Sequence, residues 1–419
     1  MARRISHGRA MASPPRPVIG EREFVAMMAL LQALQALAID VMLPALGIIS
    51  AELGSSDPNH RQLIVGLFLL GAGLGALVPG TLADRYGRRR VVLATLAIYI
   101  VTGLGCALVS DLDTLLALRF LQGLGSGGLA VLPPAIIRDR LEGDRMARLQ
   151  SLVAVVFMVV PMLAPALGQG VLLVADWRWI FGVVGVLGGG MMAWVWLRLP
   201  ETLNPENRQS VTPRAIAANM GTVLGTREAM GYVLGSALIM SAMWGFINSC
   251  QQLIAEHFGA GLAFPLVFGV LAMTMSIANF GNSRIVERFG ARRVSHAALL
   301  AYIVVSMVQV LVAFSPDQKL WQFLLLMGSN MCLMGFIGAN FTSIALQPFA
   351  QIAGAAASVQ TFLRMVIAST LGALIGQAYD GSARPLALAL LAAGSVTLLL
   401  VLYSEKGRLF RRIHWPAKA

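Results

Sequence analysis

The sequence predicts an all-α polytopic membrane protein with twelve transmembrane helices in two six-helix halves. The first observation is composition: 57% of the 419 residues are hydrophobic and only 12% are charged, about half the charge of a typical soluble domain. The second is a mean hydropathy of +0.74, with uncharged runs of about 20 residues that recur along the chain. The third is a charged loop that occurs once in each half of the sequence.

Each uncharged run is long enough to cross the membrane, because a helix rises about 1.5 Å per residue and the hydrocarbon core is about 30 Å thick. Residues 1–23 are rich in arginine and lead into a full-length run without a small-residue cleavage site, which predicts a signal anchor. The predicted spans are residues 24–48, 62–83, 91–110, 114–137, 149–172, 178–198, 229–253, 262–285, 294–314, 320–344, 354–377 and 385–403.

Basic residues gather on one side of this predicted topology. The loops on the other side contain only Arg61, Arg178, Lys319 and Arg384. The positive-inside rule therefore predicts a multi-pass protein of the cell inner (plasma) membrane, in contact with the lipid bilayer, with both termini cytoplasmic. This orientation accounts for the net charge of +12, and since no basic patch is interleaved with stacking aromatics, nucleic acid is not a predicted partner.

An internal repeat divides the chain. "DRYGRRR" at residues 84–90 matches "ERFGARR" at 287–293, and the longest polar segment lies between the two copies. Six spans followed by six spans, related as a parallel repeat, are therefore expected. The predicted parts are an N-terminal tail (1–23), an N-terminal half (24–198), a central cytoplasmic loop (199–228), a C-terminal half (229–403) and a basic C-terminal tail (404–419).

Several motifs resemble those of one transporter family. "GTLADRYGRRR", from Gly80 to Arg90, resembles the signature loop of the major facilitator superfamily, and "LALRFLQGLGSGG" is similar to its fourth-helix motif. "IDVMLPAL", "IIRDRLEGD", "PMLAPALG", "NSRIVERFGARR" and "QPFAQIAGAAAS" resemble the drug:proton antiporter branch of the bicyclomycin and chloramphenicol resistance type. This resemblance covers essentially the whole chain. It implies the major facilitator fold and proton-driven export of small hydrophobic molecules by alternating access (multidrug efflux).

Other functions stay open beside this expectation. A proton-coupled transporter of one metabolite, for export or uptake, is the nearest alternative. A membrane enzyme or receptor is disfavoured, because the sequence contains no nucleophile and base constellation, phosphate-cradling loop or histidine cluster with metal-ligand spacing. We therefore expect no enzyme activity, no cofactor and no metal, and a monomer that handles a small-molecule substrate and protons.

The charged loop is a candidate gate. Asp84 lies at the end of the second span, where the arginines that follow crowd the membrane surface, and Gly80 leaves room for a helix of the other half. The resemblance implies a charge cluster that locks the cytoplasmic side, whereas the alternative is a solvated loop that only fixes topology. The candidate gating residues are Gly80, Asp84, Arg85, Gly87 and Arg88, with Glu287, Arg288 and Gly290 in the second copy.

The fifth predicted span contains Pro161 and Pro165, followed by Gly168. Proline removes a backbone donor and is expected to kink the helix. The resemblance implies a motif that shapes the contact between halves. Val159 and Val160 depart from that motif, since glycine is expected at these positions, so a plain kinked helix is the alternative.

Three charged residues lie deep inside predicted spans: Asp40, Arg119 and Arg364. A charge costs about 2.5 to 3.5 kcal/mol at the centre of a membrane helix, so each is a candidate functional residue. Asp40 and Arg119 lie at similar depth and are candidates for proton coupling, in which Asp40 binds and releases a proton as the cavity closes and wets. A permanent ion pair that fixes helix register is the alternative.

Polar and aromatic side chains on several spans are candidates for the wall of a substrate cavity. Arg364, near the middle of the eleventh span, has no acid at matching depth in its half, so it faces the cavity, the interface between halves or an anionic substrate. A structural hydrogen-bonding role is equally open. The candidate cavity residues are Gln32, Gln122, Trp244, Asn248, Gln252 and Arg364.

Overall fold

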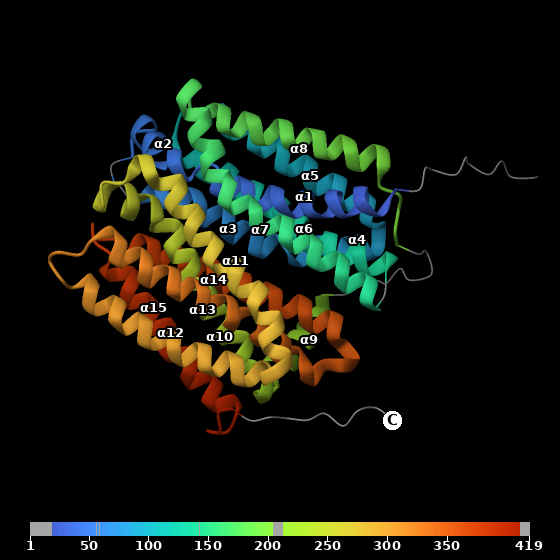
Figure 1. Cartoon of the computed structure of the whole chain (residues 1–419). Helices are drawn as coiled ribbons and strands as arrows, with labels where there is room; N and C mark the ends of the chain where they lie inside the picture. The colour runs from blue at the N-terminus through green and yellow to red at the C-terminus, as the bar shows by residue number, and fades with distance from the viewer. Residues whose placement is uncertain (1–18, 56, 58, 142, 204–212, 411–419) are drawn as a thin grey trace, which may run out of the picture.

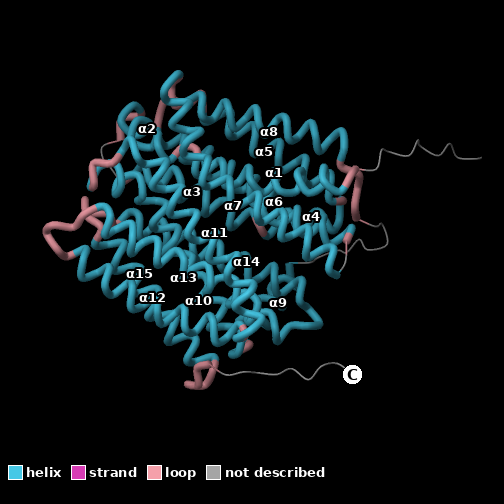
Figure 2. Tube along the Cα trace, in the orientation of Figure 1, coloured by secondary structure: helices cyan, strands magenta, loops and turns pink. Residues whose placement is uncertain are grey.

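The computed structural model describes residues 19–55, 57, 59–141, 143–203 and 213–410. These residues form helices joined by short loops, and Figure 2 shows that the loops gather at the two ends of the molecule. In Figure 1 the helices α1 to α8 fill the upper part of the view and α10 to α15 the lower part. We call the end where α1 begins and α15 ends the terminal end, and the opposite end the distal end.

The first half contains six membrane-crossing segments, of which the first two are interrupted. Its elements are α1 (Glu21–Asp40), η1 (Leu43–Ala45), α2 (Leu46–Glu52), η2 (His60–Gln62), α3 (Leu63–Gly75), α4 (Leu77–Tyr86), α5 (Arg88–Cys106), α6 (Leu112–Arg140), α7 (Gly143–Val174) and α8 (Arg178–Arg198).

The second half repeats the arrangement of six segments. Its elements are α10 (Arg227–Gln251), the π-helical turn η4 (Gln252–His257), η5 (Gly261–Ala263), α11 (Phe264–Phe289), α12 (Ala291–Ala313), α13 (Leu320–Leu346), η6 (Gln347–Ile352), α14 (Ala353–Gln377) and α15 (Arg384–Ser404).

Eleven helices of the described chain are long and apolar enough to cross a membrane, and α7, whose apolar part is Val159–Val174, is the twelfth. Large apolar side chains such as Leu311 and Leu399 point outward and are well exposed, as a lipid-facing surface requires. The predicted all-α fold of twelve transmembrane helices in two halves is confirmed. Within the predicted central loop, α9 (Pro213–Gly225) forms a short helix that contacts α14 and α10.

Glycines let helices of the first half touch backbone to backbone. A Cβ on Gly75 of α3 would lie 2.2 Å from the Leu124 carbonyl oxygen of α6, and one on Gly123 would lie 2.2 Å from that of Phe68. Small residues allow such close approach in membranes, where packing rather than hydrophobic burial drives association. The two halves meet mainly where α3 contacts α14 and where α7 contacts α11.

The first span is broken in mid-membrane. The α-helix ends at Asp40, and a 3₁₀ turn with Pro44 follows before α2 begins at Leu46. Pro44 has no N–H with which to continue the helical bond to the Asp40 carbonyl. Backbone carbonyls at the end of α1 are therefore left for other partners, directly beside the intramembrane carboxylate.

Candidate functional site

Arg119 of α6 binds the broken end of the first span. Its side chain is fully buried, and Nη2 donates to the Ala38 carbonyl at 3.0 Å while Nε donates to the Ile64 carbonyl at 3.1 Å. The third nitrogen, Nη1, donates to Oε1 of Gln122 at 2.6 Å. The guanidinium also lies 4.3 Å from the centroid of the Phe68 ring. Each of its nitrogens is thus satisfied, and Arg119 ties spans one, two and four together.

The permanent ion pair between Asp40 and Arg119, which was the alternative to a proton-coupling role, is not formed among the described residues. The guanidinium bonds to carbonyl oxygens and Gln122, while the Asp40 carboxylate, on a side chain only 5% exposed, has no hydrogen-bond or ion-pair partner among the described residues. An unpaired buried carboxylate is poised to take up a proton, because burial disfavours its charged form.

The fifth span packs directly on this break. A Cβ on Gly168 of α7 would lie 1.8 Å from the Val41 carbonyl oxygen, so only glycine allows the contact. Pro161 and Pro165 both lie inside the helix α7, and the kink that they predict stays a prediction. The Met162 carbonyl oxygen of the same region lies 3.2 Å from the Cβ position of Gly269 on α11, across the interface between halves.

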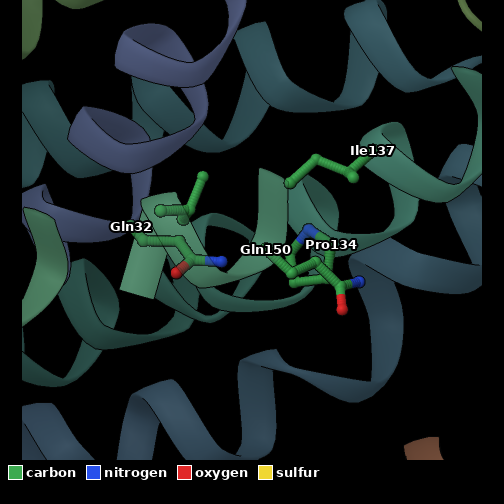
Figure 3. Close-up of a pocket in the computed structure, with 5 residues that line it drawn as sticks. Gln32, Pro134, Ile137 and Gln150 are labelled. Carbon is green, nitrogen blue, oxygen red and sulfur yellow. The ribbon is translucent and has the colours of Figure 1, made fainter. Parts of the chain in front are cut away.

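A cavity of about 230 Å³ opens between the first, fourth and fifth spans. Figure 3 shows the Gln32 side chain on one side of it and Gln150 and Pro134 on the other. Ile137 and Val153 complete the lining, so the wall is apolar with two amide groups. Such a mixture suits an apolar ligand with few polar groups.

The other candidate cavity residues lie at helix contacts in this conformation. Gln122 is fully buried and bonded to Arg119, and Trp244 of α10 is half-buried against Gly372 of α14. Asn248 is 1% exposed, and its Nδ2 donates to the Trp244 carbonyl at 2.9 Å. Contact of these three with a substrate stays a prediction.

Gln252 belongs to a group of polar residues at the distal end that joins the two halves, and we call this group the distal cluster. Nη2 of Arg61 lies 2.7 Å from Oε2 of Glu256, which joins the second span to the seventh. Gln62 is hydrogen-bonded to Gln252, and Asn59 donates to the Tyr379 carbonyl at 2.9 Å. The distal cluster consists of Asn59, Arg61, Gln62, Gln252, Glu256, Gln377 and Tyr379.

The distal cluster joins the two halves through uncharged groups as well as the ion pair. Burial raises the pKa of Tyr379 to about 12, with Glu256 adding to the rise and Arg61 opposing it, so the phenol stays neutral at physiological pH. Its hydroxyl lies 3.5 Å from the Gln252 carbonyl. The arrangement holds the halves together at the end away from the termini. Sequence reasoning missed it, since its members are far apart in the chain.

At the terminal end, the charged loop is bonded within its own half. Arg88 is 4% exposed and forms ion pairs with Asp84 and with Asp139 of α6, both at 2.7 Å. Glu201 accepts from the Arg88 backbone N–H at 2.7 Å, and Gly87, with φ of +100°, leaves room for that carboxylate. Arg85 is exposed. Open space surrounds the Cβ position of Gly80, so among the described residues no helix of the other half touches it there.

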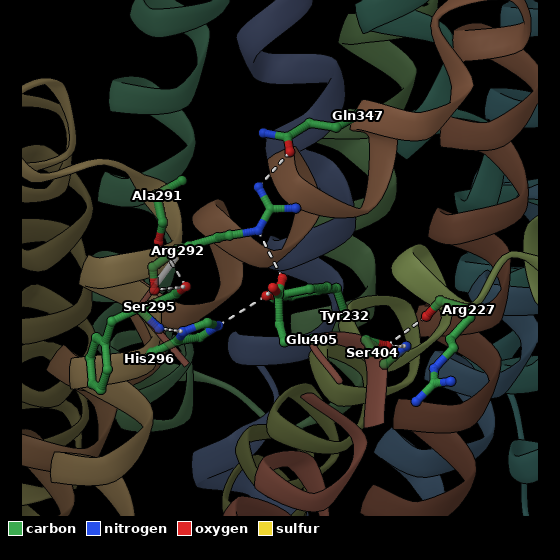
Figure 4. A network of polar contacts seen from close by, with 11 residues as sticks. Arg227, Tyr232, Ala291, Arg292, Ser295, His296, Gln347, Ser404 and Glu405 are labelled. Atoms are coloured by element: carbon green, nitrogen blue, oxygen red, sulfur yellow. Dashed lines mark hydrogen bonds and ion pairs between the residues drawn. The ribbon is translucent and has the colours of Figure 1, made fainter. Parts of the chain in front are cut away.

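The second copy of the loop also contacts a carboxylate that follows a helix, here through an arginine side chain and not through the backbone. Figure 4 shows Arg292 between Gln347 and Glu405, with hydrogen bonds of 2.8 Å to each. Glu405 follows the last helix as Glu201 follows the sixth, and it also accepts from the Tyr232 hydroxyl at 2.6 Å. The predicted gating residues of this copy lie beside it: Glu287 and Arg288 are exposed, and Gly290 has φ of +84°.

Arg364 of α14 has fewer hydrogen-bond partners than Arg119. It makes one hydrogen bond, from Nη1 to the Thr342 hydroxyl at 3.3 Å, and its buried Nε has no partner in the described part of the chain. Gln360, one turn earlier, is 2% exposed, and both its side-chain polar atoms are buried without a hydrogen-bond partner among the residues described.

Two six-helix bundles around a central interface, with charges inside the membrane, define a membrane transporter of the two-half type. The chain belongs to the Major Facilitator Superfamily, whose family model matches residues 28–373. It is 28% identical over 376 residues to multidrug resistance protein MdtL of Escherichia coli, covering 88% of this chain and 92% of that one. It is 26% identical over 364 residues to a bicyclomycin resistance protein homolog of Haemophilus influenzae, covering 87% and 91%.

The fold also matches solved transporters. The partially occluded inward open xylose transporter XylE of Escherichia coli superposes with a TM-score of 0.67 at 13% identity, covering 91% of this chain and 97% of the other. This likeness shows the fold alone. The family and fold predicted from the sequence motifs are confirmed.

Proposed function

We propose that the chain is a proton-driven secondary transporter that exports small hydrophobic molecules or drugs by alternating access. The observation that carries this proposal is Asp40, a buried carboxylate without a bonded partner among the described residues, beside the break of the first span. Protonation of such a group changes with access to water, which allows proton entry to be coupled to substrate release. The drug-resistance names of two relatives support export of drugs.

We propose that substrate and proton compete for the transporter. A substrate that enters the apolar cavity beside Gln32 disfavours a proton on Asp40, and protonation of Asp40 weakens substrate binding. Arg119 acts as the fixed element of this scheme, because its carbonyl contacts hold the broken end of α1 in place. Gly168 brings the fifth span against the same point, so movement of either helix is transmitted to the carboxylate.

The contacts at the two ends of the molecule suggest which residues act as gates. The distal cluster closes one end in this conformation, and the charged loop at the terminal end is free of the second half at Gly80. We propose that the loops around Asp84 and Glu287 come together when the terminal end closes, and that the distal cluster opens in turn. The basic residues at the terminal end support a cytoplasmic location for both termini in the inner membrane. We propose that the chain carries out this cycle as a monomer and has no enzyme activity.

Growth of a susceptible bacterial host under a panel of antimicrobials tests the export proposal. Expression of the chain should raise the tolerated concentration of several apolar compounds, and expression of Asp40→Asn at the same membrane level should not. Unchanged sensitivity to the whole panel, together with uptake or release of a single metabolite, would contradict multidrug export.

A further inference from the structure

The two arginines inside the membrane differ in how their guanidinium groups are used. Each nitrogen of the Arg119 guanidinium (Nε, Nη1 and Nη2) donates to an acceptor within the chain, and the group stacks on Phe68. Arg364 donates one long hydrogen bond to Thr342 and takes part in no ion pair among the described residues. Arg364 is half-buried and its Nε is fully buried. A charge inside a membrane span without a counter-charge is disfavoured, so we expect a partner from outside the chain.

Gln360 provides a second and independent observation. Its side chain is 2% exposed, yet neither its amide nitrogen nor its oxygen has a partner in the described chain. Positions four apart lie on the same face of a helix, so Gln360 and Arg364 point to the same side of α14. Buried amide groups are almost always hydrogen-bonded, and two adjacent groups with unused donors indicate a binding position.

The location is suited to a transported molecule. Met365, next to Arg364, packs against Gly73 of α3, where the second half meets the first. This part of α14 therefore lies at the interface that rearranges during alternating access. The unsatisfied donors lie near the middle of α14, away from both ends of the membrane span.

We propose that Arg364 and Gln360 form an anion subsite that binds the carboxylate of an otherwise apolar substrate. The inference rests on the proposed transport function and names its substrate class. A planar guanidinium presents paired donors that match the two oxygens of a carboxylate, and the Gln360 amide adds a further N–H donor. The carboxylate supplies the counter-charge that Arg364 lacks, and a lipophilic cation is repelled from the same position.

Binding of a matched probe series tests the subsite. The purified full chain in lipid nanodiscs is titrated calorimetrically with naphthylacetate, naphthylacetamide and naphthylmethylamine, which share the apolar ring and differ in charge. We expect the carboxylate to bind about tenfold or more tightly than the amide, and the amine to bind least. Arg364→Gln should remove this preference and leave amide binding unchanged.

Further variants separate a binding role from a structural one. Arg364→Lys keeps the positive charge but lacks the paired N–H donors of the guanidinium, so it should retain part of the preference for the carboxylate over the amide. Gln360→Leu should weaken only carboxylate binding. Arg408→Gln removes an exposed arginine after the last helix and should match the wild type. Unfolding temperatures identify misfolded variants. If Arg364→Gln does not fold, Arg364→Lys and Gln360→Leu test the subsite in its place.

The proposal is overturned if the wild type binds naphthylacetate no better than the amide, or if folded Arg364 and Gln360 variants weaken all three probes by the same factor. The measurement uses no proton gradient. A failure of proton-driven export therefore leaves the carboxylate preference intact, and a lost preference leaves the coupling proposal untouched.

Discussion

Removing the carboxylate of Glu256 should shift the chain toward a conformation that is open at the distal end. Arg61 and Glu256 join the two halves at 2.7 Å, with side chains that are 8% and 47% exposed. A hydrogen bond between charged groups contributes about 1.5 to 3 kcal/mol when buried, and an exposed pair less than about 1 kcal/mol. With one partner half-exposed, we estimate about 1 kcal/mol for Glu256→Gln, which is roughly a fivefold shift in the ratio of open to closed molecules.

Double electron–electron resonance measures this shift. Spin labels at Asp113 and Asp317, exposed at the distal end of the first and second halves, report the separation of the halves there after replacement of Cys106, Cys250 and Cys332. Glu256→Gln should increase the long-distance population.

Two controls test the pairing itself. The charge exchange of Arg61→Glu combined with Glu256→Arg should restore the short distance, and Asp380→Asn, which removes an exposed distal acid outside the ion pair, should have no effect. An unchanged distance distribution in Glu256→Gln would refute the assignment of this pair as a distal closure.

Three other predictions concern the interface, the charged loop and substrate selection. Gly168→Ala places a methyl group against the Val41 carbonyl and should reduce stability by about 1 to 3 kcal/mol, with a lower unfolding temperature and less transport. Gly170→Ala, where the Cβ position is surrounded by open space, should change neither. Equal stability of the two variants would contradict the contact between Gly168 and Val41. Asp84→Asn should keep near-normal substrate affinity and lose transport rate in vesicles, and a large affinity loss with normal turnover would show that the loop is not a gate. Arg364→Gln should relax exclusion of lipophilic cations in transport assays, and an unchanged charge preference would assign the residue to structure.

The sequence predicted the membrane helices well because hydrocarbon imposes a minimum length and excludes charge. The predicted run 178–198 coincides with α8, and most other boundaries differ by a few residues. The break after Asp40 was not predicted, although Pro44 could have signalled it. The helix α9, inside the predicted central loop, was not predicted, since a search for apolar runs does not detect a short helix in a polar segment.

Side-chain partners were harder to predict than spans. Equal depth favoured a contact of Asp40 with Arg119, but depth does not fix the direction in which a side chain points, and the unsatisfied carbonyl of Ala38 competes for the guanidinium. The pair of Arg61 with Glu256 joins loops that are distant in the chain, so no local pattern indicates it. The charged loop was found because the repeat marks it twice.

The central claim is that Asp40 couples proton entry to substrate export. Proteoliposomes that contain wild type or Asp40→Asn are loaded with a pH-sensitive dye, and proton movement and substrate movement are recorded together under an imposed pH gradient. Asp40→Asn, folded and inserted as the wild type is, should bind substrate but neither move protons nor transport against the gradient. Active, pH-dependent export by Asp40→Asn would contradict the account.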